Sequence, residues 1–314
     1  MPRTRLAPSP TGALHLGNAR TFAVNWALAR QCRWEIVLRI EDLDGPRVRA
    51  GAAELAIEDL AWLGLDWDAG PIDQCSDLAP YRDALVQLAS QRDIYPCRCT
   101  RRQIEAAALS APHADEHELR YPGVCRPDFA TPLTYDADDA SVAWRLRTPD
   151  EASEFVDQFA GVHRCNVQAA TGDFLVATKA GLPSYQLAVV VDDARQGIDR
   201  VVRGDDLLAS THRQRLIAQR LAIATPTAYY HLPLVRGADG RRLAKRHGDT
   251  RVAHYRALGV SAARIWGLLS EWCGLGPRRE CSAAEFCDQF TLEQLPRNDI
   301  TFTEADDHWL RGAK

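Results

Sequence analysis

Hydrophobic and polar positions in the N-terminal part of the chain follow two periods in turn. Residues 4–7 form a short extended run, and residues 34–40 form a mostly apolar run typical of a buried strand. Residues 15–32 and 50–64 instead carry apolar side chains at helical spacing, and a glycine ends the second segment. Strand–helix–strand–helix order is typical of a parallel sheet with crossover helices. The pattern therefore predicts an α/β fold.

The pattern changes in the middle of the chain. Polar sequence without periodicity is followed by two β-rich pieces between residues 142 and 159, which indicates a segment inserted into the α/β domain. Residues 184–193 predict a return to a buried strand, residues 205–223 predict an arginine-rich helix, and residues 276–314 are weakly patterned. The predicted parts are a first half of the α/β domain (1–94), an inserted α+β subdomain (95–180), a second half (181–255) and a short helical C-terminal part (256–314).

Composition narrows the class of protein. Hydrophobic residues make up 46% of the 314 positions, and no apolar run approaches the roughly 18–20 residues that span a bilayer. The N-terminus leads into Pro8 and Pro10 rather than an apolar export signal, and nine scattered cysteines suit a reducing compartment. We expect a cytoplasmic protein without membrane contact. Only three of the 38 basic residues are lysines, namely Lys179, Lys245 and Lys314.

The strongest chemical signal is the segment from Arg5 to Arg20, RLAPSPTGALHLGNAR. A strand that ends in a Gly/Pro turn and opens a helix directs backbone N–H groups and the helix dipole toward an anion. His15 can donate to phosphate oxygens there, and Gly17 leaves room for a flat base beside the backbone. His-x-Gly alone is more often an ordinary strand–turn–helix connection, but the whole segment is far more specific.

This segment resembles the signature of the class I aminoacyl-tRNA synthetases, and in particular their glutamyl branch. The HIGH motif of that class corresponds to His15-Leu16-Gly17-Asn18. The resemblance implies a Rossmann-like catalytic domain in which His15, Gly17 and Asn18 bind ATP and His15 and Asn18 assist catalysis. Asn18 replaces a histidine, so it can donate to a phosphate but carries no charge.

A second motif lies far downstream, at Arg242-Leu243-Ala244-Lys245-Arg246. It is similar to the KMSKS loop of the same class, with the lysine retained at Lys245. The resemblance implies that Lys245 and Arg246 bind ATP and that Lys245 stabilises the departing pyrophosphate. A solvated basic loop is the alternative, but its distance behind the first motif and the rarity of lysine in this chain favour the functional interpretation.

The same resemblance predicts a glutamate site. Its residues would be Arg5, Ala7, Ser9, Glu41, Tyr185 and Arg203. Arg5 and Arg203 would hold carboxylate and Glu41 the ammonium group, since glutamate carries two carboxylates and one ammonium. Each residue alone could be an ordinary strand-end charge. Ends of parallel strands beside a nucleotide motif are, however, where α/β proteins bind ligands.

A possible metal site lies in the inserted segment, where Cys97-x-Cys99 precedes Tyr121-x-x-x-Cys125. Thiolates at short spacing with two later ligands suit tetrahedral zinc, although His113 or His117 could replace the tyrosine, and unrelated buried cysteines are the alternative. The same pattern occurs in short relatives of the glutamyl enzymes, the glutamyl-queuosine tRNA(Asp) synthetases, which this chain resembles over essentially its full length. The resemblance implies one structural zinc ion at Cys97, Cys99, Tyr121 and Cys125.

The resemblance also implies an activity. The chain would convert L-glutamate and Mg-ATP to glutamyl-adenylate and then transfer glutamate to queuosine in the anticodon loop of tRNA(Asp). Roughly sixty residues follow the basic loop 236–251, so no anticodon-binding domain is expected, and we expect a monomer. Arg213, Arg215 and Arg220 could contact RNA phosphates, or they could form a solvated helix face. The alternatives are a minimal glutamyl-tRNA synthetase that charges the tRNA 3′ end, a different nucleotidylyltransferase, and an inactive RNA-binding paralogue.

Overall fold

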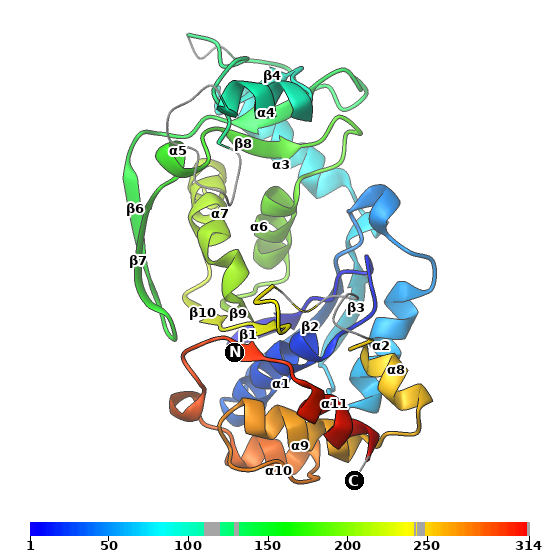
Figure 1. Ribbon diagram of the computed structural model, residues 1–314. Helices are drawn as coiled ribbons and strands as arrows, with labels where there is room; N and C mark the ends of the chain where they lie inside the picture. Colours follow the sequence, from blue (N-terminus) through cyan, green and yellow to red (C-terminus); the bar gives the residue numbers. More distant parts are fainter. Residues whose placement is uncertain (110–119, 129–131, 242, 244–248, 313–314) are drawn as a thin grey trace.

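Two short parallel sheets form the centre of the computed structural model, which describes residues 1–109, 120–128, 132–241, 243 and 249–312 (Figure 1). The first sheet has the order β1 (Arg3–Leu6), β2 (Glu35–Ile40) and β3 (Ala69–Asp73), and the second pairs β9 (Arg200–Gly204) with β10 (Ala228–Leu232). Asp199 joins the two, because its backbone N–H donates to the Arg3 carbonyl at 3.0 Å and its carboxylate accepts from the Arg3 N–H at 2.7 Å. The predicted parallel α/β arrangement is confirmed.

Helix α1 (Leu16–Gln31) is buried on several faces. It contacts β1, β2 and β9 as well as α9 (Ala262–Trp272) and α10 (Ala283–Gln289), and it lies between the sheets and these C-terminal helices in Figure 1. Small residues such as Ala19, Ala23 and Ala27 allow this close packing, and all three are fully buried. The helix start is therefore fixed in position by the core around it.

The inserted segment forms its own antiparallel sheet and a long hairpin. Strands β4 (Ile94–Cys97), β5 (Ala143–Leu146) and β8 (Phe174–Ala177) make the sheet, with α4 (Arg101–Leu109) beside it and the short α5 (Val167–Ala170) leading into β8. Hairpin β6 (Ala152–Asp157)–β7 (Gly161–Asn166) runs down one side of the molecule to β10 (Figure 1), where the Gln158 N–H donates to the Tyr229 carbonyl at 2.8 Å. The domain bounds at residues 95, 181 and 256 stay a prediction.

Residues 184–193 are not a strand, and this prediction is wrong. They belong to helix α6 (Tyr185–Arg195), which begins at Ser184, whose hydroxyl accepts from the Leu187 N–H. A short apolar run is compatible with either a buried strand or a buried helix, and here α6 is covered by α3 (Ala79–Ser90) and α7 (Leu208–Leu221). The predicted helix over 205–223 corresponds to a 3₁₀ turn followed by α7.

The C-terminal part is more ordered than its sequence pattern predicts. Helices α8 (Val252–Ala257), α9, α10 and α11 (Glu304–Arg311) pack beside α1 and α2 (Ala52–Trp62). Strand β12 (Ile300–Thr301) pairs in parallel with β11 (Val235–Arg236). Within the described part of the chain, none of the helices has the length and apolar character needed to cross a bilayer.

Candidate active site and cysteine cluster

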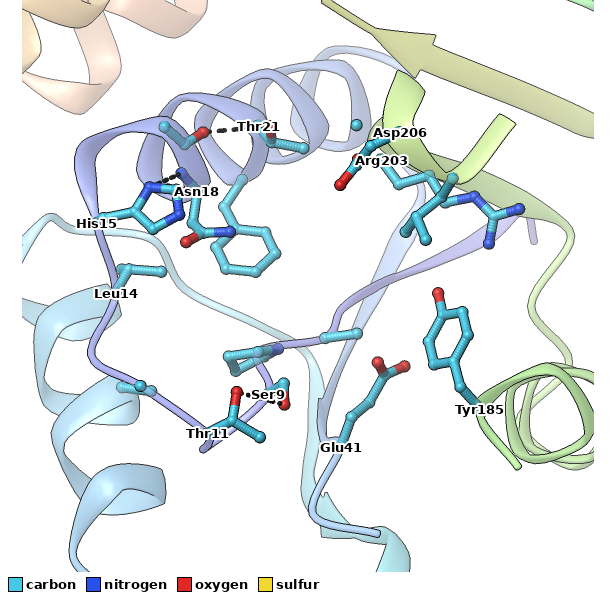
Figure 2. A pocket seen from close by; sticks show the side chains of 18 of the residues that line it. Ser9, Thr11, Leu14, His15, Asn18, Thr21, Glu41, Tyr185, Arg203 and Asp206 are labelled. Atoms are coloured by element: carbon cyan, nitrogen blue, oxygen red, sulfur yellow. Dashed lines mark hydrogen bonds between the residues drawn. The ribbon is translucent and has the colours of Figure 1, made fainter. Parts of the chain in front are cut away.

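A cavity of about 750 Å³ opens where β1, β2 and β9 end and where α1 and α6 begin (Figure 2). Its lining includes every described residue of the predicted ATP and glutamate sites: Arg5, Ala7, Ser9, His15, Gly17, Asn18, Glu41, Tyr185 and Arg203. His15 and Asn18 lie on one side, and Glu41, Tyr185 and Arg203 lie on the other (Figure 2). The cavity therefore has two chemically different halves at the carboxyl ends of parallel strands.

The His15 half is built on the start of α1. The His15 ring caps the helix, because its Nδ1 accepts from the Asn18 backbone N–H at 3.2 Å. Gly17 makes this ring position possible, since a Cβ at Gly17 would lie 3.1 Å from the His15 ring and 3.3 Å from the Val235 side chain. This half thus presents a helix N-terminus, a histidine and Asn18 to the cavity, a combination suited to an anion.

The second motif falls mostly outside the described residues: Arg242, Ala244, Lys245 and Arg246 are not among them. The described residues on either side lie against the first motif. Leu243 lines the cavity, the Leu16 N–H donates to the Thr250 carbonyl at 3.0 Å, and the Val252 N–H donates to the Leu14 carbonyl at 2.9 Å. The roles of Lys245 and Arg246 stay predictions from the sequence.

A buried network of charges supports the other half. Arg39 donates to Asp193 at 2.8 Å and to Glu41 at 3.1 Å, and Arg5 lies 3.6 Å from the Asp193 carboxylate. Burial raises the pKa of Glu41 and lowers the pKa of Arg5, whereas Asp193 and Glu41 outweigh burial and raise the pKa of Arg39. Sequence reasoning missed Arg39 and Asp193, which hold Arg5 and Glu41 in place without belonging to either motif.

Arg203 is anchored from behind by three neutral side chains. Its Nε donates to His231 at 3.0 Å, and its Nη2 donates to Thr211 and Gln214 at 2.9 Å each. Nη1 has no hydrogen-bond partner among the described residues, although Arg203 as a whole is only 5% exposed. A buried guanidinium with unused donors beside a cavity is suited to bind a ligand carboxylate.

The four predicted metal-binding residues lie together in the insertion. Sulfur atoms of Cys97, Cys99 and Cys125 are all within 4.8 Å of one another, and the Tyr121 hydroxyl lies 3.5 Å from Cys97 Sγ and 3.9 Å from Cys99 Sγ. Despite burial, hydrogen bonds from neighbouring groups lower the pKa of Cys125 to about 7. Three gathered thiols, one of them easily ionised, are compatible with zinc. The alternative ligands His113 and His117 lie outside the described residues.

Comparison with known proteins assigns the family. Residues 2–302 match the model of the class I tRNA synthetase (E and Q) catalytic domain. Two glutamyl-Q tRNA(Asp) synthetases are similar: that of Rhodopirellula baltica is 44% identical over 94% of this chain and 92% of its own length, and that of Symbiobacterium thermophilum is 45% identical over 94% of each. The chain belongs to the glutamyl-Q tRNA(Asp) synthetase family.

The fold of this family member also matches a solved structure. A glutamate tRNA ligase from Elizabethkingia meningosepticum, in complex with its amino acid, superposes with a TM-score of 0.80 at 24% identity, covering 98% of this chain and 68% of that one. The likeness confirms the expected class I synthetase fold.

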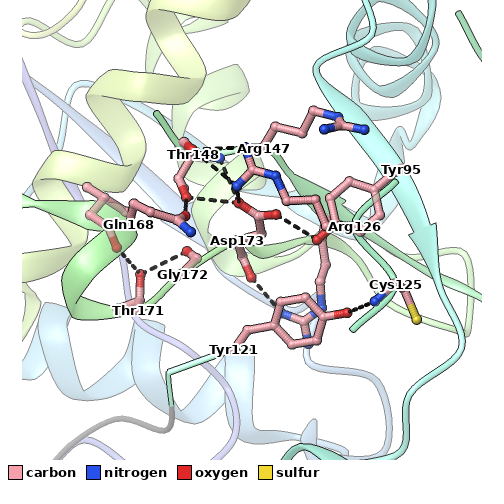
Figure 3. Close-up of polar contacts among 12 residues, drawn as sticks. Tyr95, Tyr121, Cys125, Arg126, Arg147, Thr148, Gln168, Thr171, Gly172 and Asp173 are labelled. Atoms are coloured by element: carbon pink, nitrogen blue, oxygen red, sulfur yellow. Dashed lines mark hydrogen bonds and ion pairs between the residues drawn. The ribbon is translucent and has the colours of Figure 1, made fainter. Parts of the chain in front are cut away.

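One buried carboxylate organises the insertion of this synthetase-family chain (Figure 3). Asp173, 1% exposed, accepts from the Tyr95 hydroxyl at 2.7 Å, from the Thr148 N–H and hydroxyl at 2.8 and 2.9 Å, and from Arg126 at 3.0 Å. These bonds join β4, the end of β5 and the segment after Cys125. Neither motif nor periodicity in the sequence marks Asp173.

The three arginines of α7 differ in burial, and their contact with RNA stays a prediction. Arg213 is buried and donates to Ser210 at 3.1 Å, and Arg220 lies 3.4 Å from Asp93. Arg215 lies over the Phe155 ring of the hairpin. These arginines help to pack α7 against the rest of the protein.

Proposed function

We propose that this chain activates L-glutamate with ATP and transfers the glutamyl group to queuosine in tRNA(Asp). The observation that carries the proposal is a single cavity that combines charges complementary to glutamate with the start of α1. The 44–45% identity to glutamyl-Q tRNA(Asp) synthetases over nearly their whole length supports the same activity.

Glutamate would bind in the half of the cavity that contains Arg5, Glu41 and Arg203. Its carboxylates would accept hydrogen bonds from Arg5 and from Nη1 of Arg203, and Glu41 would receive the ammonium group. Tyr185 would form a polar edge of the glutamate pocket. Ala7 and Ser9, in the turn after β1, would contact the amino acid. Because Arg39 and Asp193 already hold Arg5 and Glu41 in place, these two side chains need little reorganisation when glutamate binds.

ATP would bind in the half of the cavity that contains His15, Gly17 and Asn18, with Lys245 and Arg246 approaching from the second motif. The glutamate α-carboxylate then attacks the α-phosphorus, a new O–P bond forms, and the bond to pyrophosphate breaks. His15, Asn18 and Lys245 would stabilise the developing phosphate charge. Magnesium bound to ATP would supply further charge neutralisation on the phosphates.

Transfer would follow from the same position. A queuosine hydroxyl attacks the carbonyl carbon of the mixed anhydride, the C–O bond to the phosphate breaks, and AMP leaves. The hydroxyl proton goes to solvent. The rate gain is expected to come from alignment of the two reactants.

Cys97, Cys99, Tyr121 and Cys125 would hold one structural zinc ion. The three sulfur atoms lie within 4.8 Å of one another, and the Tyr121 oxygen accepts from the Cys125 N–H at 2.8 Å. A full set of four protein ligands leaves no open position for a substrate, so the ion would stabilise the insertion.

Two measurements on the purified full chain test the proposal. Glutamate-dependent exchange between ATP and pyrophosphate, with no tRNA present, tests activation, and replacing glutamate by glutamine tests Arg203 selectivity. Transfer of labelled glutamate to tRNA(Asp), with and without queuosine, tests the acceptor. Absence of exchange would contradict the proposed activation. It is the result expected of an inactive RNA-binding paralogue. Labelling of the tRNA(Glu) 3′ end would instead establish a minimal glutamyl-tRNA synthetase.

A further inference from the structure

A second layer of buried side chains lies directly behind Arg203. His231, on β10, and Asp157, at the end of β6, are 1% and 2% exposed. His231 Nδ1 lies 2.6 Å from Asp157 Oδ2, and His231 Nε2 accepts the hydrogen bond from Arg203 Nε. Three residues from three elements thus form one chain of hydrogen bonds that runs from the hairpin tip to the cavity wall.

The position of Asp157 is fixed by backbone donors. Its Oδ1 accepts from the N–H groups of Phe159 at 2.9 Å and Ala160 at 2.7 Å, and the His231 backbone N–H lies 3.2 Å from the same oxygen. Oδ2 lies 3.1 Å from that N–H and faces His231 Nδ1. Since a carboxylate only accepts, the proton of the imidazole must reside on Nδ1.

This tautomer is the one that Arg203 requires. Arg203 Nε–H is a donor, so it needs the lone pair of His231 Nε2. The opposite tautomer, or a protonated imidazole, would direct an N–H at the guanidinium across 3.0 Å. Thr211 and Gln214 hold the remaining edge of Arg203, so that only Nη1 is left without a protein partner among the described residues.

We infer that Asp157 and His231 act as a positioning pair for glutamate binding: Asp157 selects the His231 tautomer, and His231 fixes the Arg203 guanidinium with Nη1 left for the substrate carboxylate. The inference rests on the proposed function. It also gives the inserted hairpin a role in the glutamate site, because Asp157 on β6 contacts His231, which in turn contacts Arg203 in the cavity wall.

Three variants of the full-length chain separate positioning from stability. Asp157→Asn keeps an oxygen toward the backbone donors and turns an NH₂ toward His231 Nδ1, which selects the wrong tautomer. His231→Asn keeps a donor near Asp157 but removes the acceptor for Arg203, whereas His231→Gln can place its amide oxygen near the Nε2 position. We expect KM for glutamate to rise about tenfold in Asp157→Asn and His231→Asn, and by less than about threefold in His231→Gln.

The KM for ATP is expected to stay within about twofold of wild type in all three variants, because the His15 half is unchanged. Asp173→Asn is the matched control: it alters an equally buried carboxylate that accepts several hydrogen bonds in the same insertion. It should lower the melting temperature without changing KM for glutamate. Equal KM for glutamate in His231→Asn and His231→Gln, or an equal rise in Asp173→Asn, would overturn the inference.

A readout independent of activity keeps the inference separate from the proposed function. In ¹⁵N-histidine NMR spectra of the whole protein, with His231 assigned from the His231→Gln variant, the chemical shifts distinguish the two tautomers. Wild type should show the proton on Nδ1, and Asp157→Asn should show it on Nε2. A wild-type proton on Nε2 overturns the inference whether or not the protein activates glutamate. If the expected tautomer is present but the protein does not activate glutamate, the proposed function is contradicted. The role of Asp157 and His231 in glutamate binding is then contradicted as well.

Discussion

The cavity at the start of α1 and the cysteine cluster of the insertion gather reactive side chains in opposite ways. In the cluster, the sulfur atoms of Cys97, Cys99 and Cys125 lie within 4.8 Å of one another. In the cavity, Arg203 and Glu41 are each held from behind by other side chains and face about 750 Å³ of space. The first arrangement suits a ligand that stays, and the second suits ligands that come and go. Damage to the cluster should therefore appear in stability, and damage to the cavity in substrate kinetics.

Arg203→Ala tests the cavity side most severely. The substitution removes the positive charge and the guanidinium group that donates to Thr211 and Gln214. We expect kcat/KM for glutamate in pyrophosphate exchange to fall by about three orders of magnitude, because a charge-assisted contact is lost and buried partners are left unpaired.

Arg200→Ala is the control on the same strand. Arg200 donates to the Asp199 carbonyl, does not line the cavity, and should leave kcat/KM within about twofold of wild type. Circular dichroism establishes that both variants fold. Similar losses in the two variants would show that β9, and not the Arg203 site, was disturbed.

Cys125→Ser tests the opposite side of the comparison. Bound zinc, measured by atomic emission, should fall from one ion per chain to nearly none. The free energy of unfolding should fall by about 3 kcal/mol. This is the stabilisation expected from a bound ligand whose free concentration is about a hundred times its Kd. KM for glutamate should be unchanged, since β4 and α4 lie at the end of the molecule remote from α1 (Figure 1). Cys165→Ser, on β7 outside the cluster, should keep its zinc.

Acid should weaken the fold through His231. Burial lowers the pKa of His231 to about 4 from an unfolded value of 6.5. Burial alone would raise the pKa of Asp157, but the hydrogen bond between Asp157 and His231 helps to lower it. Between pH 6.5 and 4 the unfolded chain binds the extra proton, so stability is lost as the pH falls through this window.

Urea unfolding at several pH values, compared between wild type and His231→Gln, measures this contribution. Wild type should lose on the order of 2–3 kcal/mol more than the variant between pH 7 and pH 4. Arg203 and His163 act on the pKa of His231 in the same direction as burial, and the Asp157 carboxylate opposes them. Parallel pH profiles would show that His231 is not held neutral.

Gly17→Ala should have the smallest effect. The added Cβ would meet the His15 ring at 3.1 Å, so the ring must move, and we expect KM for ATP to rise about tenfold with KM for glutamate unchanged. Gly12→Ala provides the comparison, because Gly12 lines the same cavity but a Cβ there would meet nothing within 4 Å. Equal KM for ATP in the two variants would contradict the proposed ATP position.

The described cavity residues could be predicted because they lie in local sequence features. His15, Gly17 and Asn18 open one helix, and Arg5, Glu41 and Arg203 lie at or just beyond the ends of strands whose apolar runs are visible in the sequence. Parallel strands bring such ends to one edge of the sheet. The spatial meeting of residues 5, 41 and 203 follows from that geometry.

The supporting residues could not be predicted in the same way. Asp157 and His231 are 74 positions apart, and their contact depends on a hairpin that reaches β10, which no period in the sequence encodes. The apolar run in α6 was ambiguous because burial on several sides removes the polar face that identifies a helix. In contrast, the capping box of Ser282 and Glu285 at the start of α10 is a local Ser-x-x-Glu pattern that is visible in the sequence.

The pairing of β11 with β12 has a consequence for the order in which this protein can mature. Leu234 and Val235 line the cavity, yet Leu234 donates to Asp299 at 2.7 Å and accepts from Ile300 at 2.9 Å. While the chain is being translated, β1, β2 and α1 can assemble early, and β11 can pack on α1, but β11 lacks its neighbouring strand until residues 300 and 301 have left the ribosome. The cavity wall formed by Leu234 and Val235 is therefore complete only after the segment around Asp299 and Ile300 has emerged and paired with it.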